Sequence, residues 1–207
     1  MTLETRALMP TELERRGLSR KIEVRKTEQG KFMEGYAAVF YDASKPDETQ
    51  FRLWNDCYER IMPGAFDNAI SRPDDVRCLF NHDESDIYGR TVAGTLTLSI
   101  DKVGLRFSCL LPDTDDAGEL AVAIERGDLS ACSFGFRADD VVWRDVGEMS
   151  FRELNDVTLY DVGPVTFPAY AGTSLEIAKR SWSSYQQETR QQAAKRLQRR
   201  IRVGKLD

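Results

Sequence analysis

The sequence lacks several features that would assign it to a specialised class of protein. Its 14 glycines and 7 prolines in 207 residues are too few for a fibrous or low-complexity chain. No run approaches the roughly 20 apolar residues that span a bilayer, and the first residues have no apolar core of the kind that a signal peptide needs. We therefore expect a soluble protein that stays in the compartment where it is made.

Cysteine is scarce as well, and its spacing excludes two common kinds of site. Cys57, Cys78, Cys109 and Cys132 form no CxxC pair, so neither a zinc knuckle nor a thioredoxin-like motif is present. Their neighbours are largely apolar, which favours reduced cysteines in a hydrophobic core.

Charge is unevenly distributed along the chain. The net charge is −5, yet residues 181–207 carry 7 basic and 2 acidic residues. This basic tail follows an acidic body. The tail contains much alanine and glutamine and no proline, which favours a helix. A helix that binds a partner and a solvated helix without a specific role both fit this composition. No aromatic residues interleave with the basic ones, so we do not expect a nucleic-acid partner.

Elsewhere the pattern is dominated by short strand candidates. A turn at 101–104 joins two of them into a hairpin. A mainly β, α+β fold follows, arranged as an antiparallel barrel or sandwich with helices around it. The predicted strands cover 31–40, 51–61, 76–80, 91–100, 105–111, 129–137, 141–143, 149–154 and 156–162, and the predicted helices cover 11–16, 65–70 and 117–126.

The first chemically informative segment contains His82, the only histidine of the chain. An imidazole is the side chain best suited to accept and return a proton near neutral pH. Three acidic residues follow, Asp83, Glu84 and Asp86, which leaves a metal site open as a second interpretation. Consecutive acids at the end of a strand more often form a solvated turn, so we expect no metal.

The second segment is a predicted strand that presents a serine. Alternation places Cys132 on the buried face and Ser133 on the opposite face, between Ala131 and Gly135. These small neighbours should leave the Ser133 hydroxyl uncovered, with room for a substrate backbone. Ser130 is a weaker candidate at the start of the strand. The Gly-x-Ser-x-Gly elbow of many other serine hydrolases is absent from the sequence.

The third segment places Asp161 in an otherwise apolar stretch. A buried carboxylate is costly unless it is paired, and a histidine N–H would be a suitable partner. A serine needs a base to remove its proton, and a carboxylate can fix the tautomer of that base. Ser133, His82 and Asp161 therefore predict a nucleophile, a base and an orienting group.

Several short motifs occur in the order found in one protein family. They are Glu34-Gly35-Tyr36-Ala37-Ala38-Val39-Phe40, Ile61-Met62-Pro63-Gly64-Ala65-Phe66, Leu79-Phe80-Asn81-His82-Asp83, Tyr88-Gly89-Arg90-Thr91, Gly104-Leu105-Arg106-Phe107, Gly127-Asp128-Leu129-Ser130-Ala131-Cys132-Ser133-Phe134-Gly135-Phe136 and Val165-Thr166-Phe167-Pro168-Ala169. Over residues 31–175 the chain resembles the prohead, or capsid maturation, serine proteases of tailed bacteriophages.

The resemblance implies an endopeptidase with a fold similar to herpesvirus assemblin, a closed β-barrel surrounded by helices. It implies His82 as general base and Ser133 as nucleophile, with no metal and no organic cofactor. The third member in this family is usually a glutamate. Here the corresponding residue is Asp161, and Asp156 and Asp83 are the alternatives.

The resemblance also implies partners and a location. The substrates would be the major capsid protein, the scaffold polypeptide and the enzyme itself, inside the assembling procapsid in the host cytoplasm. Assembly into a homo-oligomer is compatible with the sequence, and no membrane partner is expected. The chain would comprise a flexible arm over 1–30, a protease domain over 31–175 and a basic helical tail over 176–207. A catalytically inactive, scaffold-binding capsid-assembly protein of the same fold is the alternative.

Overall fold

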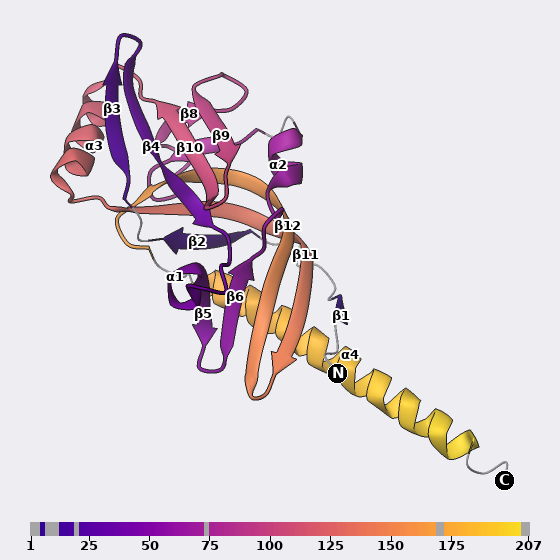
Figure 1. The fold of residues 1–207 in the computed structure, drawn as a ribbon. Helices are drawn as coiled ribbons and strands as arrows, with labels where there is room; N and C mark the ends of the chain where they lie inside the picture. The colour runs from indigo at the N-terminus through magenta and orange to yellow at the C-terminus, as the bar shows by residue number, and fades with distance from the viewer. Residues whose placement is uncertain (1–4, 7–12, 19–20, 73–74, 169–171, 204–207) are drawn as a thin grey trace.

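Two β-sheets with helices packed around them make up the fold in the computed structural model (Figure 1). The structure describes residues 5–6, 13–18, 21–72, 75–168 and 172–203. The strands within these residues are β1 (Thr5–Arg6), β2 (Glu14–Leu18), β3 (Glu23–Thr27), β4 (Gly30–Val39), β5 (Gln50–Trp54), β6 (Cys57–Ile61), β7 (Arg77–Leu79), β8 (Ile87–Arg90), β9 (Leu96–Ile100), β10 (Gly104–Leu110), β11 (Ala131–Val146) and β12 (Met149–Val165). The helices are α1 (Pro46–Thr49), α2 (Asp67–Ser71), α3 (Asp115–Arg126) and α4 (Gly172–Val203).

The larger sheet is built around the long hairpin of β11 and β12. Gly147 at φ 63° provides the left-handed residue of its turn. β11 also pairs with β1 and β2, whereas β12 pairs in parallel with β6 and β7. The smaller sheet has the order β3-β4-β10-β9, and every neighbouring pair in it is antiparallel.

A single hydrophobic core lies between the two sheets. Cys132 and Phe134 of β11 and Phe107 of β10 are fully buried in it. A Cβ on Gly35 of β4 would lie 3.2 Å from the Phe107 ring and 3.3 Å from the Cys132 sulfur, so glycine allows this close approach. All four cysteines are free and buried, which confirms the prediction of reduced core cysteines.

The closed barrel expected from the resemblance is wrong for the described residues. Their strand ladders form one eight-stranded and one four-stranded sheet, and no ladder joins the two. The sheets meet through side chains rather than through backbone hydrogen bonds. The α+β class and the predominance of strands are confirmed, and the likeness to assemblin stays a prediction.

Several local predictions also differ from the structure. Residues 14–16, expected to be helical, belong to strand β2, because β11 offers them backbone partners. Residues 91–94 form a turn instead of the first half of a strand, and Val92 is exposed. The 51–61 strand is a hairpin of β5 and β6. Of the arm expected to be flexible over 1–30, the segments 14–18 and 23–27 are strands within the two sheets.

Two helices follow the sequence closely. α3 begins after Thr114, whose side chain accepts a hydrogen bond from the Ala117 N–H, and ends at Gly127 with φ 84°. α4 covers most of the predicted helical tail. Its first half packs on β11, where the Trp143 indole donates to the Ser181 hydroxyl at 3.0 Å, and it then extends away from the sheets (Figure 1). Among the described residues, none of the helices is both long and apolar enough to cross a membrane.

A cluster of four fully buried charges ties β2 to the rest of the larger sheet. Glu14 and Arg16 come from β2, Glu59 from β6 and Arg152 from β12, and the side chains of all four are 0% exposed. Arg152 Nη1 donates to Glu14 at 2.7 Å and to Glu59 at 2.6 Å. Burial raises the pKa of Glu59, but the guanidinium groups of Arg16 and Arg152 more than offset this and hold its pKa below the usual value. The cluster contains two positive and two negative charges, so it is neutral as a unit.

Replacing Glu59 with glutamine should destabilise the protein strongly. Glu59→Gln leaves two buried guanidinium groups facing one carboxylate, and breaking a buried pair in this way costs about 3–5 kcal/mol. The free energy of unfolding, measured by urea denaturation, should fall by that amount. The exposed Glu28→Gln serves as the control and should change it by less than about 0.5 kcal/mol. Equal stability of the two variants would contradict the role given to the cluster.

Candidate active site

His82 lies in a tight turn at the end of β7. Asn81 and His82 both adopt left-handed backbone conformations, with φ of 53° and 60°, and they are the non-glycine residues with positive φ in the described chain. Such conformations are uncommon without glycine and persist where the surroundings enforce them. β7 pairs in parallel with β12, which sets Arg77 beside Asp161. The turn therefore brings the imidazole next to the Asp161 side chain.

Asn81 holds this turn against the end of β12. Its N–H donates to the Pro164 carbonyl at 3.0 Å. Its side-chain amide donates to the Thr166 hydroxyl at 3.1 Å, and its side-chain oxygen accepts the Thr166 N–H at 2.8 Å. Three hydrogen bonds thus fix the residue that precedes His82. Asn81 was not among the predicted site residues, although its place directly before the histidine was the available signal.

Two glycines make room for this arrangement. A Cβ on Gly163 would lie 2.0 Å from the Leu79 carbonyl oxygen, so β7 can approach β12 here only if the residue is glycine. A Cβ on Gly135 would lie 2.2 Å from Asp161 Oδ2. Gly135 faces Asp161 in the β11–β12 ladder, whereas Ser133 faces Gly163. The absence of side chains at 135 and 163 therefore allows the carboxylate and the histidine turn to pack beside the serine strand.

The three predicted side chains meet in one hydrogen-bonded chain. His82 Nε2 lies 2.7 Å from Ser133 Oγ. On the other side of the ring, His82 Nδ1 is hydrogen-bonded to Asp161 Oδ1. The His82 and Asp161 side chains are 10% and 7% exposed, so water has little access to their contact. With Asp161 as a carboxylate, Nδ1 carries a proton and Nε2 can accept one from the hydroxyl.

The expectation that the Ser133 hydroxyl is uncovered is wrong. Ser133 is only 2% exposed, because strand β2 lies along β11 and pairs Gly17 with Ser133. The Ser133 hydroxyl lies 2.8 Å from the Arg16 carbonyl oxygen and can donate a hydrogen bond to it. The covering strand lies 117 positions away in sequence, so the composition of the serine segment gave no signal of it.

The alternative site residues lie apart from this chain of contacts. Asp83 accepts the Ser85 N–H at 2.8 Å, as in a solvated turn. Asp156 accepts a hydrogen bond from the Asn68 side chain at 2.9 Å. Ser130 is exposed at the end of the segment that precedes β11. Burial raises the pKa of the Cys132 thiol to about 12, so almost none of it is thiolate at neutral pH.

A cavity of about 450 Å³ opens beside the imidazole. His82 and Asp161 line it, together with Arg15 of β2 and Leu13, which directly precedes β2. Ile87, 51% exposed, and Tyr160, 41% exposed, are also part of its wall. The cavity is therefore bordered by side chains from both the His82 turn and the β2 segment.

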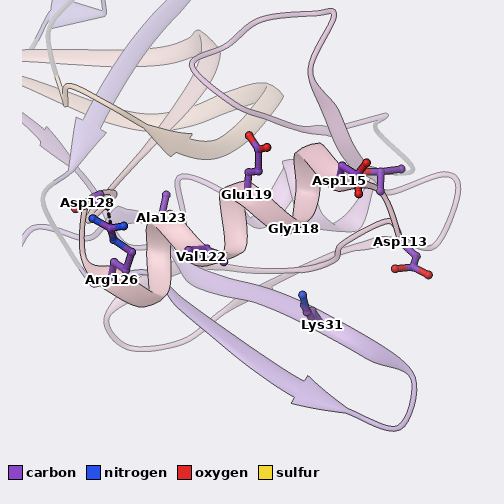
Figure 2. Close-up of a pocket in the computed structure, with 10 residues that line it drawn as sticks. Lys31, Asp113, Asp115, Gly118, Glu119, Val122, Ala123, Arg126 and Asp128 are labelled. Atoms are coloured by element: carbon purple, nitrogen blue, oxygen red, sulfur yellow. Dashed lines mark ion pairs between the residues drawn. The ribbon is translucent and has the colours of Figure 1, made fainter.

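A larger hollow of about 760 Å³ lies beside α3 (Figure 2), and His82 is not among the residues that line it. Its lining carries charges of both signs, among them Lys31, Asp113 and Glu119. Figure 2 also shows the pair between Arg126 and Asp128, whose side chains lie 3.0 Å apart. None of the residues lining this hollow belongs to the hydrogen-bonded chain of Ser133, His82 and Asp161.

A hydroxyl, an imidazole and a carboxylate linked in this order form the arrangement used by serine hydrolases, whatever their chain order. A model of one such family, described as caudovirus prohead serine protease, matches residues 20–188. The match covers most of the 207 residues, and the chain belongs to this family of phage prohead proteases. No curated protein and no solved structure matches the chain.

Gly163→Ala should disrupt the approach of β7 to β12. The new Cβ would meet a backbone carbonyl, which cannot move aside as a flexible side chain could. We expect the free energy of unfolding to fall by about 1–3 kcal/mol, as for overpacked sites. Gly118→Ala is the control, because its Cβ meets open space on α3 and alanine favours a helix by about 1 kcal/mol. The free energy of unfolding measured by urea denaturation should therefore fall for Gly163→Ala and rise for Gly118→Ala. A change in the same direction for both variants would contradict this account.

Proposed function

We propose that this protein is a serine endopeptidase of phage capsid maturation in which Ser133 is the nucleophile, His82 the general base and Asp161 the orienting carboxylate. The main support is the 2.7 Å contact between His82 Nε2 and Ser133 Oγ, with Asp161 on the opposite ring nitrogen. Membership of the prohead protease family supports the reaction class independently.

The proposed reaction is acyl transfer. Ser133 Oγ attacks the scissile carbonyl carbon while its proton passes to His82 Nε2. His82 then gives this proton to the leaving amine, and an ester to Ser133 remains. A water molecule loses its proton to Nε2, attacks the ester and restores the enzyme. Asp161 keeps the Nδ1 proton in place and stabilises the imidazolium that forms at each step.

The proposed substrates are polypeptides of the assembling procapsid. They are the scaffold polypeptide or the scaffolding arm of the major capsid protein, together with this chain itself. The support for this class is the family, whose members act in prohead maturation. The site of action is then the interior of the procapsid in the host cell. An inactive assembly protein of the same fold is the alternative that the following experiment separates.

Co-expression with the major capsid protein that is proposed as the substrate tests the three roles. Ser133→Ala and His82→Ala should abolish shortening of the capsid protein on a gel, as expected for a loss of about 10⁶-fold in turnover. Asp161→Asn should slow it by about 10⁴-fold, because the imidazole loses its required tautomer. Masses of the products would locate the cleaved bond.

Each variant has a matched control on the same chain. Ser130→Ala removes the exposed neighbouring serine, and Asp83→Asn removes the carboxylate that caps the turn after His82. Both should process the capsid protein at the rate of the unmodified protein. Unchanged processing by Ser133→Ala, or an equal loss with Ser130→Ala, would contradict the assignment.

A further inference from the structure

Strand β2 occupies the edge of β11 that carries Ser133. The pairing is antiparallel over five positions, with Gly17 opposite Ser133 and Arg16 opposite Phe134. β2 lies outside residues 20–188, the part of the chain that the family model matches. An extended peptide bound along an exposed strand edge is a common mode of peptide recognition. β2 therefore lies where an extended substrate would need to lie to reach Ser133.

The contact at Ser133 is that of an unproductive occupant. Attack would require the carbonyl carbon to face Ser133 Oγ, but the Arg16 carbonyl presents its oxygen, at 2.8 Å. The Ser133 hydroxyl has one proton, and His82 Nε2 also lies within hydrogen-bond distance of Ser133 Oγ, at 2.7 Å. A hydroxyl that donates to Arg16 cannot at the same time donate to His82. The strand thus covers the serine and competes for its proton.

Two side chains of β2, Glu14 and Arg16, bind a pair of opposite charge, Arg152 of β12 and Glu59 of β6. Glu14 accepts from Arg152 at 2.7 Å, and Arg16 donates to Glu59 at 2.8 Å. The Arg16 guanidinium also lies 5.4 Å from the Phe136 ring centroid. Glu59 and Arg152 also pair with each other, at 2.6 Å. A peptide that replaces β2 must supply one acid and one base, or leave buried hydrogen-bonding groups unpaired.

The position after Arg16 is restricted by shape. A Cβ on Gly17 would lie 2.7 Å from Pro168 Cα, a backbone atom that has little freedom to move aside. Two residues before Arg16, Glu14 points toward the buried pair, whereas Leu13 lines the cavity beside His82 together with Ile87 and Tyr160. Glu14, Arg16 and Gly17 thus each meet a surface of matching charge or size, and Leu13 lines the cavity.

We infer that β2 is an intramolecular occupant of the substrate site, and that this site selects extended peptides of the pattern Glu-x-Arg-Gly. The scissile carbonyl would belong to the arginine, with Glu59 and Arg152 as the residues that determine specificity. This inference rests on the proposed function, because it takes Ser133 as the nucleophile. The substrate class is then a basic-acidic segment of a capsid or scaffold polypeptide with this spacing, and β2 must leave before such a segment can bind.

The test measures peptide binding to full-length protein that cannot turn over. The probe is a fluorescein-labelled peptide with the sequence of residues 11–19. Three matched peptides carry glutamine for the glutamate at position 14, methionine for the arginine at 16, or alanine for the glycine at 17. Fluorescence anisotropy is recorded with Ser133→Ala protein, and with the same protein also carrying Glu14→Gln and Arg16→Met. The two added changes weaken β2, remove one charge of each sign and leave Glu59 and Arg152 intact.

We expect the unaltered peptide to bind the protein with weakened β2 at least about tenfold more tightly than Ser133→Ala alone, because the occupant competes less. Each altered peptide should bind the protein with weakened β2 at least about tenfold more weakly than the unaltered peptide does. A control protein with Ser133→Ala, Glu176→Gln and Lys179→Met, an exposed ion pair on α4, should behave as Ser133→Ala does. Circular dichroism of each protein checks that it is folded.

Equal binding of all four peptides, or no binding to a folded protein with weakened β2, would overturn the inference. These outcomes are independent of the proposed function, because no measurement depends on turnover. If the capsid protein is processed but the peptides bind without selectivity, the Glu-x-Arg-Gly pattern is contradicted and the proposed peptidase activity is supported. If the peptides bind selectively but the capsid protein is not processed, the peptide site is supported and the proposed catalytic roles are contradicted.

Discussion

The register of β7, β12 and β11 is the constraint on which the rest of the site depends. Parallel pairing places Arg77 beside Asp161, and antiparallel pairing places Gly135 beside Asp161 and Gly163 beside Ser133. A shift of a single residue in either ladder would send the Asp161 or Ser133 side chain to the opposite face of the sheet. The glycines at 135 and 163 make this register sterically accessible, and Asn81 fixes the turn that completes it.

The same sheet serves two requirements that conflict. A serine strand in the centre of a sheet is rigid, which favours fixed positions for reacting groups. A strand that binds an extended substrate, however, needs an open edge. In this molecule β11 has β12 on one side, and β2 and β1 on the other. Strand β2 supplies hydrogen-bond partners for the backbone groups along that edge. The four buried charges hold β2 there without adding net charge to the core.

The sequence predicted the local elements well where the signals were local. Helix α3 and the hairpin of β9 and β10 follow from patterns within a dozen residues. It failed where the partner is distant. Residues 14–16 have helical preferences in isolation, but pairing with β11 overrides them. The cover over Ser133 and the cluster around Glu59 were missed for the same reason. The Ser133, His82 and Asp161 segments could be named from chemistry, whereas their separation in space could not.

The position of β2 in the chain has a consequence for biosynthesis. This strand leaves the ribosome well before its partners Ser133 and Arg152, which lie 117 and 138 positions later. Closing so long a loop is slow compared with forming local hairpins. During translation the nascent chain therefore holds an unpaired strand until β11 and β12 have emerged. The edge of β11 at Ser133 therefore stays uncovered until this long-range pairing with β2 has formed.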